Sequence, residues 1–201
     1  MSLDAPDGWA RSDTRLAPPE LAPSPKVTVE DWRVFAPARG NDATMVAACF
    51  RGGATGWLPE ADAIALQKLE AVAASTYLRL GVEGGFTSYG DVTRDGPVRT
   101  RTLDGPAHAR TFLAFDAAGG VHGCFALCAR ASGSDRAACA AAVDASKLEG
   151  AFVEAPAPTA WMRALAWAVH HPGGAAATVA LLAVFLGALA VVTRRRPRHR
   201  P

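Results

Sequence analysis

Lysine, aromatic side chains and charge are all scarce in this chain of 201 residues. Lysine occurs only at Lys26, Lys68 and Lys147, aromatic residues make up 7% of the sequence, and charged residues make up 20%. Arginine and alanine are plentiful instead, a bias typical of GC-rich coding, so we expect a bacterial source. The length accommodates one domain with its own core and some additional segments, but not two full domains.

The body of the chain also lacks an excess of positive charge. The net charge is +2, but five arginines lie within the last eight residues, so the sequence before them is slightly acidic. A nucleic-acid-binding surface needs basic residues clustered on a folded domain. We therefore expect no nucleic-acid partner, although the sequence pI is about 8.5.

Signatures of catalytic and cofactor-binding sites are missing as well. The chain contains no G-x-S-x-G, P-loop or H-E-x-x-H motif. The glycine-rich residues 81–86 follow a predicted helix and precede a predicted strand, whereas a phosphate-binding loop precedes a helix. The sequence favours a protein that is not an enzyme, and it identifies no catalytic, cofactor-binding or metal-binding residue.

A single long apolar run is present, and it lies close to the end of the chain. Residues 175–193 contain no charged side chain. As a helix they would extend about 28 Å, close to the hydrocarbon thickness of a bilayer. We predict a transmembrane helix at 175–193 followed by a basic tail at 194–201, so the lipid bilayer is an expected partner.

The segment at 156–174 connects the predicted domain to this run. Trp161, Leu165 and Ala168 lie on one side of a predicted helix, which Pro172-Gly173-Gly174 ends. Two interpretations stay open: an interfacial helix at the level of the lipid headgroups, and a linker helix packed on the domain.

Two rules predict opposite orientations in the membrane. The arginines after the span outnumber Arg163 shortly before it, which favours a cytoplasmic C-terminus and an exported domain. The first residues, however, are polar and proline-rich and lack the apolar region of a signal peptide. We expect a tail-anchored protein of the bacterial inner membrane with a cytoplasmic domain, and a periplasmic domain is the alternative.

An ordered domain is predicted at residues 26–155, after a disordered lead at 1–25 in which prolines occur without periodicity. A long helix is predicted within 58–81, with Gly81 at its C-terminal cap. Its apolar residues recur at spacings of three and four and form one stripe: Leu66, Leu69, Ala73, Tyr77 and Leu80. We expect this stripe to pack on a sheet.

Alternating runs separated by turn sequences predict the strands of that sheet. The predicted strands are 26–37, 44–50, 86–92, 98–103, 108–116 and 121–130, and a second helix follows at 135–150. An antiparallel sheet of about five or six strands covered by two helices gives an α+β fold, with the transmembrane helix in addition.

The order of these elements and the end of the domain carry a resemblance to a known family. A late helix leads into Ser146, Leu148 and Phe152 in the sequence "SKLEGAF". In both respects residues 26–152 resemble the PsbP-like α/β sandwich domains. The resemblance implies a binding or assembly domain without enzymatic activity.

Four cysteines are the candidates for redox or metal chemistry. Strand alternation puts His122, Cys124 and Cys128 on one face, and Cys139 can approach from the second helix. No C-x-x-C pair is present, and unpaired cysteine is commonly buried, so we expect Cys49 and most of the other thiols to lie in the core. A zinc site, or a Cys128–Cys139 disulfide in an exported domain, stays open.

Arginines form a second candidate cluster, made of Arg94, Arg99, Arg101 and Arg110. Arg99 and Arg101 share one face of a predicted strand. We expect solvated arginines on an exposed sheet face, and a basic surface for an anionic ligand or lipid headgroups is the alternative.

Taken together, these features predict a single-pass membrane protein whose domain binds or scaffolds a protein partner of unknown identity. One alternative is a membrane-tethered enzyme that uses Cys124 or Cys128 as nucleophile and His122 as base; His108 is the only other histidine of the predicted domain. Another alternative is an exported envelope protein with structural disulfides.

Overall fold

A computed structural model describes residues 2–3, 6–18, 27–38, 43–54, 56–129 and 134–171. The chain divides into two compact units, Met1–Ala157 and Pro158–Pro201. None of the helices in the described ranges has the length and apolar character needed to cross a bilayer. The predicted transmembrane helix at 175–193 and the basic tail at 194–201 lie outside the described residues.

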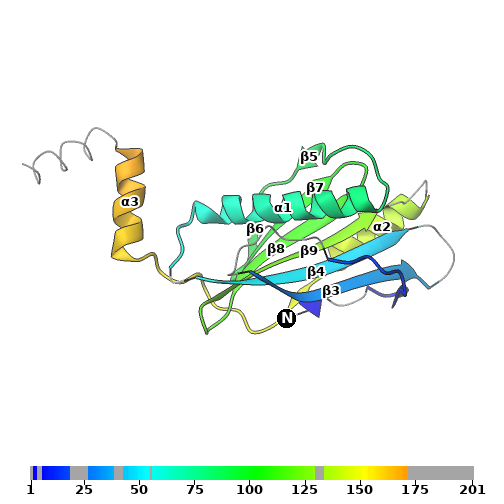
Figure 1. The fold of residues 1–201 in the computed structure, drawn as a ribbon, viewed down its shortest axis with the longest axis horizontal. Coiled ribbons are helices and arrows are strands. Elements are labelled where there is room, and N and C mark those ends of the chain that lie inside the picture. The colour runs from blue at the N-terminus through cyan, green and yellow to red at the C-terminus, as the bar shows by residue number, and fades with distance from the viewer. Residues whose placement is uncertain are drawn as a thin grey trace, which may run out of the picture. The chain divides into compact units, whose positions relative to one another are not determined.

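An eight-stranded antiparallel sheet forms the centre of the first unit (Figure 1). Its strands are β2 (Trp9–Arg11), β3 (Thr28–Pro37), β4 (Thr44–Gly53), β5 (Ser88–Tyr89), β6 (Thr93–Asp95), β7 (Val98–Asp104), β8 (His108–Phe115) and β9 (Gly120–Ala129). Their spatial order is β2-β3-β4-β9-β8-β7-β5, and β6 also pairs with β7. The N-terminal hairpin β3–β4 therefore joins the C-terminal meander β7–β9 through the pairing of β4 with β9.

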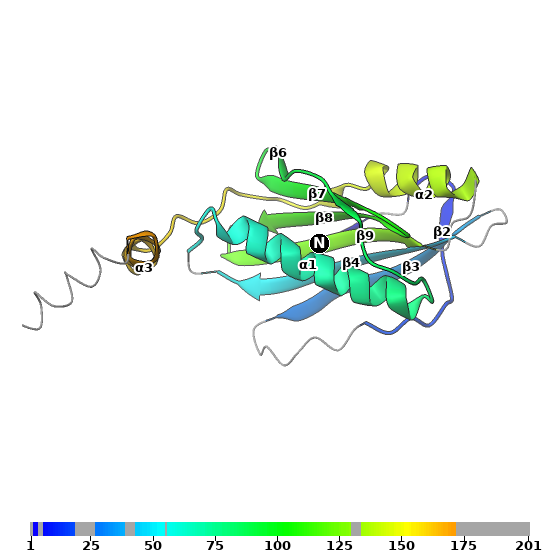
Figure 2. The same cartoon turned by 90° about the horizontal axis from the view of Figure 1, so that it is seen from above.

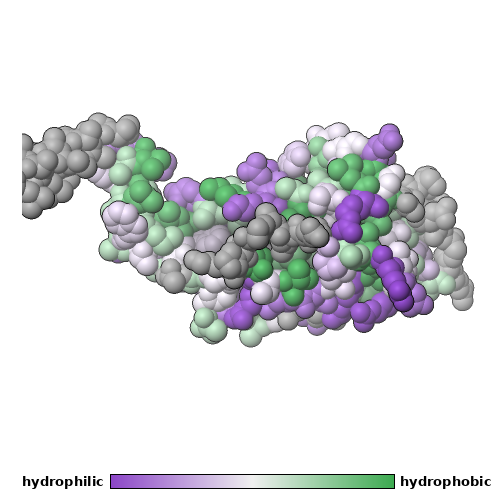
Figure 3. Space-filling model, viewed as in Figure 1, coloured by the Kyte–Doolittle hydropathy of each residue, from purple (hydrophilic) through white to green (hydrophobic). Residues whose placement is uncertain are grey.

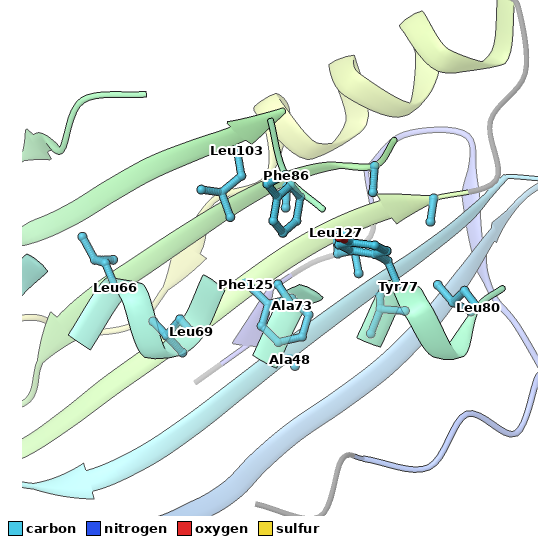
Figure 4. Packing of buried hydrophobic residues seen from close by; sticks show 14 of the residues in the cluster. Ala48, Leu66, Leu69, Ala73, Tyr77, Leu80, Phe86, Leu103, Phe125 and Leu127 are labelled. Atoms are coloured by element: carbon cyan, nitrogen blue, oxygen red, sulfur yellow. The ribbon is translucent and has the colours of Figure 1, made fainter. Parts of the chain in front are cut away.

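Helix α1 (Ala61–Arg79) packs on one face of this sheet with the predicted apolar stripe. All five stripe residues, Leu66, Leu69, Ala73, Tyr77 and Leu80, are buried. They pack against Leu103, Phe125 and Leu127 from the sheet (Figure 4). Gly81 follows with a φ of 77°, the left-handed conformation predicted for the end of the helix.

The other face of the sheet is covered by helix α2 (Ser134–Ala145) and by a two-stranded sheet of β1 (Ser2–Leu3) and β10 (Leu148–Glu149). Leu3 and Val143 are fully buried there beside Phe112 and Ala126. Figure 2 shows α1 crossing the strands obliquely in front of the sheet. The fold is thus α+β with an antiparallel sheet, as predicted, in three layers, but the sheet has eight strands and not the five or six expected, because short strands extend its edges.

The structure differs from the sequence prediction in two places, at residues 2–11 and at residues 86–97. Residues 2–3 and 9–11, predicted to be disordered, form strands, because Leu3 fills the core and β2 extends the sheet edge next to β3. Of the strand predicted at 86–92, only β5 at Ser88–Tyr89 is formed, and β6 at Thr93–Asp95 follows that range. A two-residue turn, Gly96-Pro97, connects β6 to β7, and Gly96 has a φ of 56°.

In the second unit the structure describes helix α3 (Ala160–His170). The Thr159 side chain accepts a hydrogen bond from the Met162 backbone N–H at 3.3 Å and caps the helix. None of the α3 side chains is buried.

Candidate functional site

An apolar groove of about 470 Å³ lies between α1 and the sheet. It is lined by Val27, Phe50, Arg51, Gly52, Trp57, Ala65, Lys68, Leu69, Ala71, Val72, Leu113, Val121 and Gly123. Only Arg51 and Lys68 in this lining carry charge. A concave, mainly apolar surface with few polar groups is the usual form of a ligand-binding or peptide-binding site.

Close packing of α1 at one point fixes the floor of this groove. A Cβ atom at Gly123 of β9 would lie 2.8 Å from Leu69 Cδ2, so the Leu69 side chain packs directly on the glycine and would have to shift to admit a larger residue. Both residues line the groove. The helix forms one wall of the groove and the sheet the other, and Leu69 and Gly123 meet between them.

Trp57 is held in the groove lining by contacts on three sides. Its indole Nε1–H donates a hydrogen bond to Asp62 Oδ1 at 2.7 Å, and its backbone N–H donates to the Pro156 carbonyl at 3.0 Å. Its ring packs edge-on against Phe115 with 4.9 Å between the centroids. Because these contacts fix the indole, its exposed part is a preorganised apolar surface.

A charged cluster adjoins the groove through Arg51. The Arg51 guanidinium lies 2.9 Å from Asp116 Oδ2 and 3.9 Å from Glu30 Oε1. His122, whose side chain is 5% exposed, contacts Glu30 Oε2 with Nδ1 at 2.9 Å and Asp116 Oδ2 with Nε2 at 2.8 Å. Glu30 reaches this position from a β-bulge between Val29 and Asp31.

The hydrogen bonds of this cluster are directed inward and not at a substrate. An ionised carboxylate only accepts, so His122 can donate to both neighbours at once only as the imidazolium. The hydrogen bond from His122, followed by the bond from the Gly120 backbone N–H, holds the pKa of Asp116 well below its ordinary value. With both ring nitrogens occupied, His122 in this arrangement has no free nitrogen to act as a base on a thiol.

The four cysteines form two disulfides, Cys49–Cys124 and Cys128–Cys139. Cys49 and Cys124 are direct neighbours on β4 and β9 with 4.1 Å between Cα atoms, and the Cα atoms of the second pair are 5.6 Å apart. The expected burial of the cysteines is confirmed, and so is the shared face of His122, Cys124 and Cys128. As disulfides, these residues provide no thiolate for a zinc ion or for nucleophilic attack.

The predicted exposed arginine face is wrong for Arg99 and Arg101. Arg99 is 4% exposed, and its Nε lies 3.2 Å from Asp62 Oδ2. Arg101 Nη1 lies 3.0 Å from Glu70 Oε1, and Glu70 is itself buried. Both arginines face α1, whose two carboxylates neutralise them, so they do not form a basic surface for an anion.

The two remaining arginines of that cluster lie apart from each other. Arg94 contacts the same Asp62 carboxylate at 3.3 Å from a more exposed position. Arg110 donates to the Asp144 carbonyl at 2.7 Å on the α2 side of the sheet. The sequence therefore identified a set of residues that the structure divides between two faces.

His108 occupies a second site between two carboxylates, also on the α2 side. Its Nδ1 contacts Asp104, and its Nε2 lies 3.0 Å from Asp144 Oδ1. A shallow depression of about 750 Å³ opens next to it, lined in part by Arg136. Within the described ranges, no group of three or more histidine, cysteine or acidic residues is arranged to hold a metal ion.

The groove and the two buried carboxylates of α1 are not among the sites that the sequence predicted. Asp62 lies four residues before Leu66 and Glu70 four residues after it, so both carboxylates fall on the apolar stripe of the helix. This spacing is the sequence feature that could have predicted their burial. An acidic residue in such a stripe indicates a buried cation on the opposing surface.

No family model, curated protein or solved structure matches this chain.

Proposed function

We propose that the protein is a single-pass membrane-anchored binding protein whose α+β domain lies on the oxidising side of the membrane. In this proposal the groove between α1 and the sheet holds an apolar segment of a protein partner. The observation that carries the proposal is the pairing of all four cysteines in two buried disulfides.

The disulfides favour an exported domain because such bonds form and persist outside the reducing cytoplasm. The positive-inside rule points the same way, since the five arginines of the tail at 194–201 would then lie in the cytoplasm. We therefore prefer a periplasmic or equivalent extracytoplasmic domain to the cytoplasmic one that the first residues of the chain favour.

Binding without catalysis is supported by the pairing of the reactive groups. His122 is enclosed by Glu30 and Asp116, and Arg99 and Arg101 are paired with carboxylates of α1. The groove, in contrast, offers an apolar surface with the fixed indole of Trp57. A binding or assembly role is also what the resemblance to PsbP-like domains implies.

The side of the membrane is tested by reporter fusions and by alkylation. A periplasm-dependent reporter fused before Met1 should be active, and the same reporter fused after Pro201 should be inactive. In the same cells, a maleimide-polymer reagent should label the denatured chain only after reduction. A cytoplasmic N-terminal reporter, or thiols that react without reduction, would overturn the proposed location.

The binding surface is tested by photo-crosslinking in the membrane. A photo-reactive residue at Lys68, on the groove rim, should give an adduct of defined size with a protein partner. The same residue at Leu78 is the matched control, because Leu78 is 54% exposed and lies on α1 outside the groove lining. Equal adducts from both positions, or none from Lys68, would contradict binding in the groove.

A further inference from the structure

Helix α3 carries a stripe of large apolar side chains that no described residue covers. Trp161 is 74% exposed, Leu165 52% and Val169 69%. Spacings of four residues put the three on one face of the helix. Hydrophobic side chains on the surface of α3 are visible in Figure 3.

The opposite side of α3 is polar. Arg163 and His170 project about 140° to 160° away from Leu165 around the helix axis, at about 100° per residue. Trp167 lies beside them and stacks on His171, with 5.4 Å between the ring centroids. The helix is thus amphipathic, with its indoles divided between the two faces.

We propose that α3 lies in the membrane interface with Trp161, Leu165 and Val169 among the lipid acyl chains; this rests on the proposed membrane anchor. The helix ends at His170, and the uncharged run begins at Ala175. Five residue steps of extended chain cover at most about 18 Å. If residues 175–193 span the bilayer, the end of α3 therefore stays within about 18 Å of the hydrocarbon boundary.

The composition of α3 fits a lipid surface better than a protein surface. Tryptophan is enriched at the membrane–water boundary, where its ring is buried and its N–H stays hydrated. Arg163 on the polar face can pair with lipid phosphate groups. In the sequence, Pro172-Gly173-Gly174 stands between α3 and the uncharged run, a composition that disfavours one continuous helix.

The test uses the full chain reconstituted in vesicles of phosphatidylcholine and phosphatidylglycerol, with and without lipids brominated near the headgroup end of the acyl chains. Bromine quenches tryptophan fluorescence only at short range. In Trp161→Phe, most of the quenching should be lost. In the matched control Trp167→Phe, it should be largely retained, because Trp167 lies on the polar side.

Alkaline carbonate extraction of the same vesicles separates this inference from the proposed function. A chain that is extracted has no membrane anchor, and the proposed function then fails together with this inference. A chain that resists extraction but shows equal quenching in Trp161→Phe and Trp167→Phe overturns only the interfacial position of α3. Resistance to extraction with quenching that depends on Trp161 supports both.

Discussion

Arg99 and Asp62 form an ion pair between β7 and α1, with 3.2 Å between Nε and Oδ2 and with both side chains nearly inaccessible to solvent. They are 37 residues apart in the sequence. Asp62 also accepts a hydrogen bond from Trp57, which links this pair to the groove lining. The buried ion pair and the groove lining therefore share the Asp62 carboxylate.

Removal of one partner of this pair should strongly destabilise the domain. Asp62→Ala leaves Arg99 buried without its carboxylate, and we expect a loss of about 3 kcal/mol or more in the free energy of unfolding. Arg99→Met should cost less, because Arg94 still contacts Asp62. The control Arg33→Met, in a pair with Asp31 that is more exposed, should cost at most about 1 kcal/mol.

Urea unfolding of the Met1–Ala157 unit measures these differences. The double variant Asp62→Ala/Arg99→Met should lose less than the sum of the single variants, since neither charge is then left alone. Additive losses would show that the two side chains do not interact in solution.

The two disulfides should differ in how much they stabilise the fold. The Cys49–Cys124 bond closes a loop of 75 residues and the Cys128–Cys139 bond a loop of 11. Loop entropy alone gives about 4.5 kcal/mol for the first and about 2.8 kcal/mol for the second. Cys49→Ala/Cys124→Ala should therefore melt at a lower temperature than Cys128→Ala/Cys139→Ala, as measured by calorimetry. The reverse order would contradict the expected pairing or its entropic origin.

The Asp116 carboxylate should stabilise the fold in a pH-dependent way. Its folded-state pKa is lowered by the hydrogen bond from His122 and then by that from Gly120. The ionised carboxylate therefore stabilises the folded state fully above about pH 4, and this contribution is lost as the pH falls toward the lowered pKa. The stability difference between the wild type and Asp116→Asn should shrink as the pH falls below about 4. A difference that grows on acidification would refute this assignment.

Tyr77 should ionise at a higher pH than an exposed tyrosine. Burial raises its pKa, with a smaller effect from Tyr89, and its hydroxyl donates a hydrogen bond to the Gly84 carbonyl. Since the chain has only two tyrosines, Tyr89→Phe leaves Tyr77 as the single phenol. Its absorbance at about 295 nm should titrate above pH 10, the ordinary pKa of tyrosine. The stabilisation by neutral Tyr77 should be lost as the pH rises through this raised pKa. A midpoint at or below pH 10 would show that Tyr77 is exposed.

Gly123→Ala should displace the Leu69 side chain of α1 from its contact with β9. The added Cβ would lie 2.8 Å from Leu69 Cδ2, so we expect destabilisation by about 1–3 kcal/mol from overpacking. Gly53→Ala is the matched control, because a Cβ at that position meets no atom within 4 Å. Adding Leu69→Ala to Gly123→Ala should relieve the contact and recover part of the loss. Equal thermal stability of the two glycine variants would show that the close approach does not exist.

Local periodicity predicted the parts of the fold that depend on local sequence. The stripe of α1 has enough length for a spacing of three and four to be recognised, and β8 and β9 are long enough to alternate. The strands β1 and β2 have two and three residues, too few for any period. They are strands because β1 pairs with β10 and β2 pairs with β3. The residues of β1 and β2 themselves do not predict these pairings.

The candidate site depended on pairings between distant segments and was therefore less predictable. Alternation showed that Arg99 and Arg101 share a face, but it does not show which face lies beneath a helix. Four cysteines allow three pairings. A Cys128–Cys139 bond could be considered as an alternative because the strand and the following helix are close in sequence, whereas Cys49–Cys124 follows only from the pairing of β4 with β9.

The cross-links also determine how the chain responds to tension. If residues 175–193 hold the protein in the membrane while the N-terminal residues are pulled, force is transmitted through Cys49–Cys124 and not along the segment between them. That loop, with the shorter one closed by Cys128–Cys139, would add nothing to the length of the stretched chain until a reductant cut the bonds. Under such a pull on the N-terminal residues, the domain would lengthen only through the residues outside the two loops.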